Sequence, residues 1–352
     1  MKKKLGLGLL SLVAFVFCIS SPKALSTYNY ESWTSGAGYG QATKIDDVTT
    51  NLKGESNATG GMYIGPYSKA STAKLADGIT EEVYVEIDPS KIDNGEYFEV
   101  SLALKNSSNE YVSEAVVMTQ KTGNDFVISS GWAPGFSAKI SNKGIYTYQW
   151  KMYVEGDKTY AQFTLLMGKR VISTTGKIDF DTIVTPDTKN PIASQDDVSV
   201  KYLWFCNISI KKGINVYTEL PTVNVTLVDP TEEEDLVLEA YKYCSFTKEE
   251  LDEIIQILKE AAKEEGYNFE GFYSDEKFEN EYNMLNPFTE DVTIYVKASK
   301  IEEPVKDVTP VTTTQKAEKN PNTADNVGLY FVLAAMGLGV VGLTTRSLIK
   351  HH

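Results

Sequence analysis

Histidine and cysteine are the scarcest reactive residues in this sequence of 352 residues. It contains two histidines, both at the C-terminus, and three cysteines, of which Cys18 lies in an apolar run. Cys206 and Cys244 are too far apart in the sequence for the spacing of a zinc site. Phosphate-binding glycine loops and Ser/His/Asp sets are also missing. We therefore expect no zinc site, no Cys/His nucleophile pair and no enzymatic activity.

The sequence also has fewer basic than acidic side chains. The chain has 34 basic and 48 acidic side chains, a formal net charge of -14. Proteins that bind nucleic acid carry basic surfaces to meet the phosphates, so we expect no nucleic-acid partner. Hydrophobic residues make up 42% and aromatic residues 11% of the chain, which is enough for packed cores.

The N-terminus has the three parts of a secretion signal. Lys2, Lys3 and Lys4 precede the apolar run LGLGLLSLVAFVFCI, and Ala24-Leu25-Ser26 supplies small residues at a cleavage site. This pattern predicts a signal peptide over residues 1–26. A retained membrane anchor is the alternative interpretation.

The C-terminus contains a second apolar run. Residues 327–345 are 19 residues without charge, about 28 Å as a helix, which matches a hydrocarbon core of about 30 Å. Arg346 and Lys350 follow it, and positive residues favour the cytoplasmic side. We expect a transmembrane helix with the preceding segment NPNTA outside the cell.

This order of pentapeptide, apolar span and basic tail resembles the cell-wall sorting signal of Gram-positive surface proteins, the Leu-Pro-x-Thr-Gly (LPXTG-like) family. The pentapeptide here is Asn320, Pro321, Asn322, Thr323 and Ala324, with Asn for the usual Leu and Ala for Gly. The resemblance implies that a sortase cleaves after Thr323 and joins it to the peptidoglycan of the cell wall. The alternative is an anchor that is never cut.

Between these terminal signals the chain divides by charge. Residues 27–217 hold 22 acidic and 18 basic side chains, whereas residues 218–300 hold 21 and 7. We therefore predict two domains with these bounds. Residues 301–319 are rich in Thr, Val, Pro and charge, as in an extended stalk or linker, and residues 320–352 hold the sorting signal.

The first domain is dominated by apolar residues at every second position. One face is predicted to hold Tyr146, Tyr148, Trp150, Met152 and Val154, and a second strand to place Val200, Tyr202, Trp204, Cys206, Ile208 and Ile210 together. Eight or more such strands favour a jelly-roll-like antiparallel β-sandwich. In pattern the domain resembles the concanavalin-like lectin and carbohydrate-binding-module superfamily.

The second domain begins with strand-like TVNVTLVD and continues into a helix. Thr247 and Glu250 form a capping box, apolar residues follow at helical spacing, and Gly266 ends the helix. The stretch after it resembles the internalin-type B repeat (Listeria-Bacteroides repeat), which implies a small α+β (β-grasp) spacer or adhesion module. The matching residues are Gly266, Tyr267, Phe269, Gly271, Tyr273, Asp275, Tyr282, Pro287, Thr289, Asp291, Thr293 and Tyr295.

Sugar binding is the leading functional hypothesis for the first domain, since aromatic rings in loops can stack on a pyranose. The candidates are Trp132, Tyr63, Tyr67 and Trp33. The alternatives are a protein-binding or structural wall module and, more distantly, a glycoside hydrolase.

Two acidic motifs suggest further sites. Glu86-Ile87-Asp88 is similar to the start of the Glu-x-Asp-x-x-Glu signature of laminarinase-like glycosidases, but Lys91 stands where the third carboxylate is required. The pairs Asp46-Asp47 and Asp196-Asp197 could join a structural calcium site.

Overall fold

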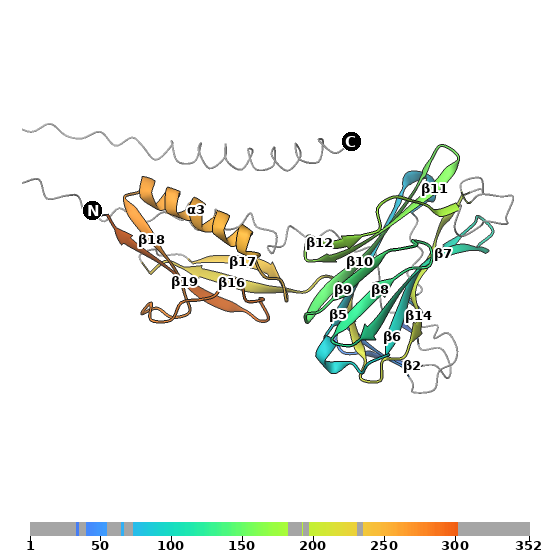
Figure 1. Ribbon diagram of the computed structural model, residues 1–352, viewed down its shortest axis with the longest axis horizontal. Helices are drawn as coiled ribbons and strands as arrows, with labels where there is room; N and C mark the ends of the chain where they lie inside the picture. Colours follow the sequence, from blue (N-terminus) through green and yellow to red (C-terminus); the bar gives the residue numbers. More distant parts are fainter. Residues whose placement is uncertain are drawn as a thin grey trace, which may run out of the picture.

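The computed structural model describes residues 33–34, 40–54, 65–66, 73–181, 192, 197–230 and 235–301. These residues are mainly β, as the sequence predicted, and form a larger β-sandwich next to a smaller unit with one long helix (Figure 1). One hydrophobic core takes its residues from positions 52 to 216, and a second takes them from positions 223 to 296.

An eight-stranded antiparallel sheet forms one layer of the sandwich. Its order is β12-β11-β10-β5-β15-β3-β2, with β13 paired to β11. The strands are β2 (Gly40–Lys44), β3 (Thr49–Gly54), β5 (Ile79–Ile87), β10 (Gly144–Glu155), β11 (Lys158–Met167), β12 (Arg170–Thr174), β13 (Ile178–Asp179) and β15 (Ile214–Tyr217).

A five-stranded antiparallel sheet of order β14-β6-β7-β8-β9 forms the other layer. Its strands are β6 (Tyr97–Lys105), β7 (Tyr111–Thr122), β8 (Asp125–Ser129), β9 (Ser137–Ile140) and β14 (Ser199–Ile208). Short elements complete the sandwich: the pair β1 (Trp33–Thr34) and β4 (Gly65–Pro66), and the 3-10 helices η3 (Leu75–Asp77) and η4 (Pro89–Lys91).

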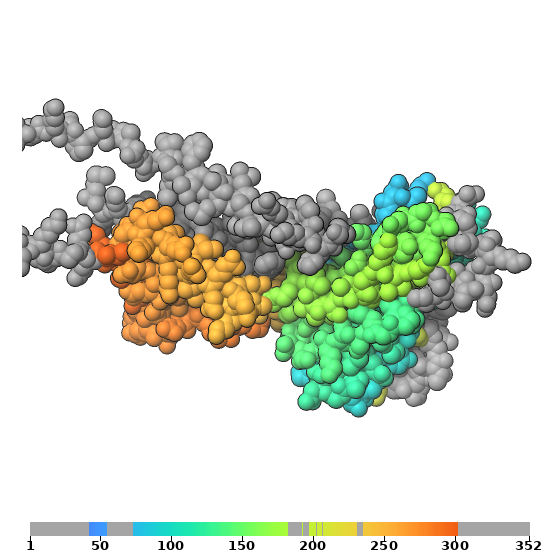
Figure 2. Space-filling view, turned by 45° about the horizontal axis from the view of Figure 1, so that its top comes forward, coloured from blue at the N-terminus to red at the C-terminus, as the bar shows by residue number. Residues whose placement is uncertain are grey.

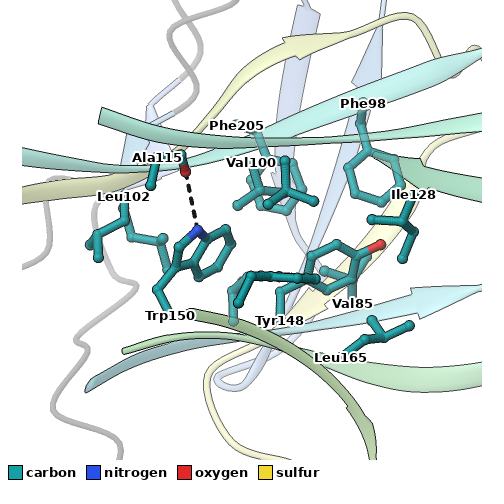
Figure 3. Close-up of a cluster of buried hydrophobic side chains, with 14 of the residues drawn as sticks. Val85, Phe98, Val100, Leu102, Ala115, Ile128, Tyr148, Trp150, Leu165 and Phe205 are labelled. Atoms are coloured by element: carbon teal, nitrogen blue, oxygen red, sulfur yellow. Dashed lines mark hydrogen bonds between the residues drawn. The ribbon is translucent and has the colours of Figure 1, made fainter. Parts of the chain in front are cut away.

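The main core lies between the two sheets, and β10 confirms the predicted alternation. Tyr148 and Trp150 point from β10 toward the other sheet (Figure 3) and are fully buried. The Trp150 indole N–H donates to the Ala115 carbonyl over 3.1 Å, and the hydroxyls of Tyr148 and Thr119 lie 2.8 Å apart. Each polar group of these rings therefore has a partner inside the apolar layer.

The predicted face of β14 is confirmed at Val200 and Ile208, but Trp204 is buried outside the core between the sheets. The pairing of β14 with β6 shifts register twice, between Val200 and Tyr202 and between Phe205 and Asn207. Each shift interrupts the alternation of side chains. Trp204 consequently lies opposite Ser101, while its neighbour Phe205 enters the core between the sheets.

The smaller unit is a four-stranded sheet with a helix on one face. Its order is β17-β16-β19-β18, and its central strands β16 and β19 are parallel. The elements are β16 (Thr222–Val228), β17 (Leu236–Tyr241), α3 (Lys248–Glu264), β18 (Tyr267–Tyr273) and β19 (Val292–Lys300).

The helix α3 begins and ends as the sequence predicted. The Thr247 side chain accepts from the Glu250 N–H, and the Glu250 carboxylate accepts from the Thr247 N–H, which completes the capping box. Gly266 has a φ of 80°, and its N–H donates to the Lys263 carbonyl after the last turn. The apolar stripe of the helix then packs on the sheet.

The two units contact each other through the segment that follows β17. Tyr243 packs with Tyr84, Ile145 and Tyr217 of the sandwich. One terminal nitrogen of Arg170, at the start of β12, lies 2.6 Å from the Glu250 carboxylate and 2.9 Å from the Ser245 carbonyl. The units are therefore joined by side-chain contacts as well as by the chain.

Several predicted segments lie outside the described residues: the signal peptide 1–26, the stalk from residue 302 onward, the sorting pentapeptide 320–324 and the apolar span 327–345. No helix within the described ranges is long and apolar enough to cross a membrane.

Candidate functional site

The first candidate, Trp132, is buried. Its side chain is 5% exposed, it packs edge-on against Phe180, and its indole N–H donates to the Val116 carbonyl over 3.0 Å. We expected the Trp132 ring to be available in a loop for stacking on a sugar, and the structure corrects this expectation. The ring is folded inward, so Trp132 has no open face for a ligand.

The other predicted aromatic residues lie wholly or partly outside the described structure. Trp33 is in the short strand β1, where it pairs with Pro66 of β4. Tyr63 and Tyr67 lie outside the described residues.

The predicted acidic pairs are used in turns and ion pairs. Asp46 accepts from the Val48 and Thr49 N–H groups, and these hydrogen bonds keep its pKa below the usual value. Asp47 pairs with Lys44, and Asp197 pairs with Lys74. Asp196 lies outside the described residues, and no cluster of metal-binding side chains occurs within them.

The Glu86–Asp88 motif does not form a pair of facing carboxylates. Asp88 caps the helix η4, where it accepts from the N–H and the hydroxyl of Ser90. Glu86 lies on the outer face of β5 and accepts from the Tyr217 hydroxyl over 2.6 Å. Tyr243 also donates to Glu86 over 3.2 Å, from the smaller unit.

The Glu86 carboxylate is held in its charged form. Burial alone would raise its pKa, but hydrogen bonds from Tyr217 and Asn215 and the positive charge of Lys143 outweigh that effect, so the pKa of Glu86 lies below its usual value. The Lys143 ammonium is 3.4 Å from this carboxylate and 4.6 Å from the centre of the Tyr243 ring. These residues stabilise the contact between the two units.

A second polar and aromatic surface lies farther along the same sheet. Tyr153 of β10 and Tyr160 of β11 are directly opposite each other, with ring centres 5.9 Å apart and planes inclined by 29°. Their neighbours Met152 and Ala161 are in the core, so both rings are on the outer face. Both tyrosines are partly exposed. We call this pair and the polar residues beside it the tyrosine face.

The hairpin turn sets this pairing. Glu155 and Lys158 close a two-residue turn whose first central residue, Gly156, has a φ of 66°. Glycine adopts this conformation without steric cost, which fixes the register of the two strands. Tyr153 and Tyr160 stand at equal distances from the turn and therefore meet.

Polar side chains continue the tyrosine face toward the smaller unit. Lys151 pairs with Gln162 in the next row, and Gln149 pairs with Thr164 in the row after that. Gln149 donates to Glu82 over 2.6 Å on one side, while Gln162 donates to the Thr174 hydroxyl over 3.0 Å on the other. Amide, hydroxyl and carboxylate groups thus follow the aromatic pair across four strands.

Lysine side chains flank the two rings. The Lys177 ammonium lies 3.8 Å from the centre of the Tyr160 ring, and the Lys151 ammonium lies 5.6 Å from that of Tyr153. Lys177 also forms an ion pair with Glu155, and this hydrogen bond raises its pKa. The rings therefore stand between cations, as in cation–π contacts.

Figure 2 shows how these strands reach the surface. Residues of β11 and β12, in light green, extend from beside the smaller unit toward the far end of the sandwich. The tyrosine face was missed in the sequence because neither tyrosine is in a loop. The signal was available in YVEGDKTY, where two tyrosines flank a Gly-Asp turn at equal distance.

In comparisons with known proteins, no family model and no curated sequence matches the chain. Its function is therefore inferred from its own residues and geometry.

Proposed function

We propose that this chain is a secreted surface protein of a Gram-positive bacterium, anchored to the cell wall, whose β-sandwich binds carbohydrate. The support for secretion and anchoring is the sequence order: signal peptide, folded part, stalk, NPNTA pentapeptide, apolar span and basic tail. A sortase is the partner that this order implies, and peptidoglycan is the attachment site.

The arrangement of the strands in both units supports this proposal. Two packed antiparallel sheets support a lectin-like sandwich. In the smaller unit, two hairpin-like strand pairs joined by a helix have parallel central strands, the arrangement of a β-grasp module. That arrangement supports the resemblance to an internalin-type B repeat.

The observation that carries the binding proposal is the tyrosine face. A sugar presents apolar C–H groups on one face and hydroxyls around its rim. Tyr153 and Tyr160 supply aromatic surface for the first, and Gln149, Gln162 and Glu82 supply donors and acceptors for the second. The long Lys177 side chain is at the surface, so it can move aside for a ligand and donate to a hydroxyl.

Protein binding or a purely structural role is the second candidate. It is favoured by the contact between the units, where Tyr243 donates to Glu86 and Arg170 pairs with Glu250. A glycoside hydrolase has less support, because Asp88 caps a turn and Lys91 occupies the position of the general acid.

A glycan array tests the binding proposal. Residues 27–319 should bind at least one wall, mucin or plant glycan, and Tyr160→Ala should weaken that binding by about 1–3 kcal/mol, by analogy with bases stacked on aromatic rings. Tyr111→Ala is the matched control, because Tyr111 is an exposed tyrosine on the other sheet. Equal binding by both variants, or no binding by the intact protein across a broad array, would overturn the proposal.

A further inference from the structure

The connections of the smaller unit run through its two central strands. The chain enters β16 directly from the sandwich and leaves β19 toward the predicted stalk. The two strands are parallel and adjacent, with Val225 opposite Val292 and Val228 opposite Tyr295. Figure 1 shows that β19 ends on the side of the unit away from the sandwich.

This geometry determines how a pulling force acts on the strands. A force on the sandwich pulls β16 toward its N-terminal end at Thr222, and a force on the stalk pulls β19 toward its C-terminal end at Lys300. In a parallel pair these two directions are opposite along the strand axis. The hydrogen bonds that join the strands are therefore loaded together, in shear, and do not open one after another from an end.

Side chains reinforce the same pair. Leu227 of β16 and Ile294 of β19 are fully buried beneath α3. The Asp291 carboxylate, directly before β19, accepts from the Asn224 N–H over 2.8 Å and from the Asn224 side-chain amide over 3.2 Å. This contact extends the link between the strands beyond the last backbone pair.

The contacts between the units act alongside the connecting chain at residues 218–221. Arg170 links the sandwich to Ser245 and Glu250 of the smaller unit. Tyr243 makes a second link through Glu86. A force from the sandwich therefore reaches the smaller unit through several contacts.

We propose that the β16–β19 pair is a mechanical clamp, which keeps the smaller unit folded when a ligand holds the sandwich and the wall holds the C-terminus. Its biological role rests on the proposed anchoring, whereas the mechanical property itself depends on the fold alone. The clamp requires no glycan, so its test is independent of the binding test.

Single-molecule force spectroscopy on residues 27–319 tests the clamp. The protein is held by its two ends, and unfolding of the smaller unit is recognised by the length of chain released. This end-to-end pull is the first geometry. In the second geometry the protein is held at its C-terminus and at a handle attached to exposed Glu264. That geometry opens β18 and β19 from their adjacent ends, Tyr267 and Lys300. Because four pairs are sheared together in the first geometry, its unfolding force should be roughly two- to fourfold higher.

A matched pair of variants distinguishes an effect on the unfolding force from an effect on equilibrium stability. Asp291→Ala removes the contact to Asn224 at the loaded pair. Asp275→Ala removes a similar exposed carboxylate, which accepts from Lys277, Glu279 and Asn280 in the loop between β18 and β19. Both variants should lose similar equilibrium stability in urea, but only Asp291→Ala should lower the unfolding force under end-to-end load. Equal forces in the two pulling geometries, or equal loss of force in the two variants, would overturn the proposal.

Discussion

Glu81 of β5 lies directly opposite Trp150 of β10, on the face of the sheet that is turned toward the core. Its side chain is 2% exposed, and its Oε2 atom has no hydrogen-bond partner in the described part of the chain. Burial, with a smaller effect from the charge of Glu82, raises the pKa of Glu81 to about 8. This carboxyl group is therefore mostly protonated at neutral pH.

Glu81 should make the stability of the sandwich dependent on pH. Its pKa is raised on folding, so the folded state retains a proton that the unfolded chain releases. The stabilising effect of that proton is complete below the unfolded pKa of 4.5 and is lost as the pH rises through about 8. Across this window Glu81 lowers the free energy of unfolding by up to about 1.4 kcal/mol per pH unit.

Urea unfolding between pH 5 and pH 9 checks this prediction. Glu81→Gln should remove most of the loss of stability at high pH, because an amide does not ionise. Glu82→Gln is the control and should keep most of the pH dependence, since Glu82 makes only the smaller contribution to the raised pKa of Glu81 and its own carboxylate accepts from Tyr84 and Gln149. If the difference between Glu81→Gln and the natural protein is the same at every pH, Glu81 is not the titrating group.

Trp132→Ala should destabilise the sandwich by about 3–5 kcal/mol, because it leaves a cavity beside Phe180 and removes one hydrogen bond to the Val116 carbonyl. Trp132→Phe should cost less, since it keeps most of the apolar volume. Urea denaturation measures both effects. An unchanged midpoint for Trp132→Ala would show that the ring is not part of the core.

Arg170→Ala should uncouple the two units. Its guanidinium donates to the Ser245 carbonyl and to the Glu250 carboxylate, and hydrogen bonds to charged groups contribute about 1.5–3 kcal/mol. Calorimetry should then show one unfolding transition for each unit, with melting temperatures farther apart than in the natural protein. Lys158→Ala, which breaks an ion pair with Asp179 inside the sandwich, should leave the coupling unchanged. Identical thermograms for both variants would exclude this role of Arg170.

Thr323 should be the C-terminal residue of the wall-bound protein, because the proposed sortase forms an acyl bond to the Thr323 carbonyl. Mass spectrometry of material released from the wall measures this end directly. Thr323→Ala should leave the protein in the membrane or the medium. A mature wall protein that still contains residues 327–345 would contradict the proposed sorting.

Features that depend on neighbouring residues were predictable from the sequence. The alternation in β10 placed Tyr148 and Trp150 in the core, and the spacing of Thr247 and Glu250 gave the capping box and the start of α3. In both cases the responsible interaction acts within a few residues, so a short stretch of sequence contains the whole cause.

Features that depend on register or on distant packing could not be predicted in this way. Two shifts in the pairing of β14 turn Trp204 away from the core, and nothing within the strand marks where its partner bulges. Trp132 is buried because Phe180, far along the chain, packs against it. Glu81 occupies an inward position although its charge suggests an outward one. The tyrosine face is different, because the Gly-Asp turn that pairs Tyr153 with Tyr160 is visible in the sequence, although both tyrosines are on strands and not in loops.

The junction at Tyr243 also restricts how these modules can be exchanged between proteins. Replacing the smaller unit by an unrelated module would uncover the apolar surfaces of Tyr84, Ile145 and Tyr217. It would also take away one of the donors that hold Glu86. Recombination at the linker alone would thus produce a sandwich with an exposed apolar patch and with fewer hydrogen-bond donors around the Glu86 carboxylate. The two modules are expected to be inherited, truncated and engineered as a pair.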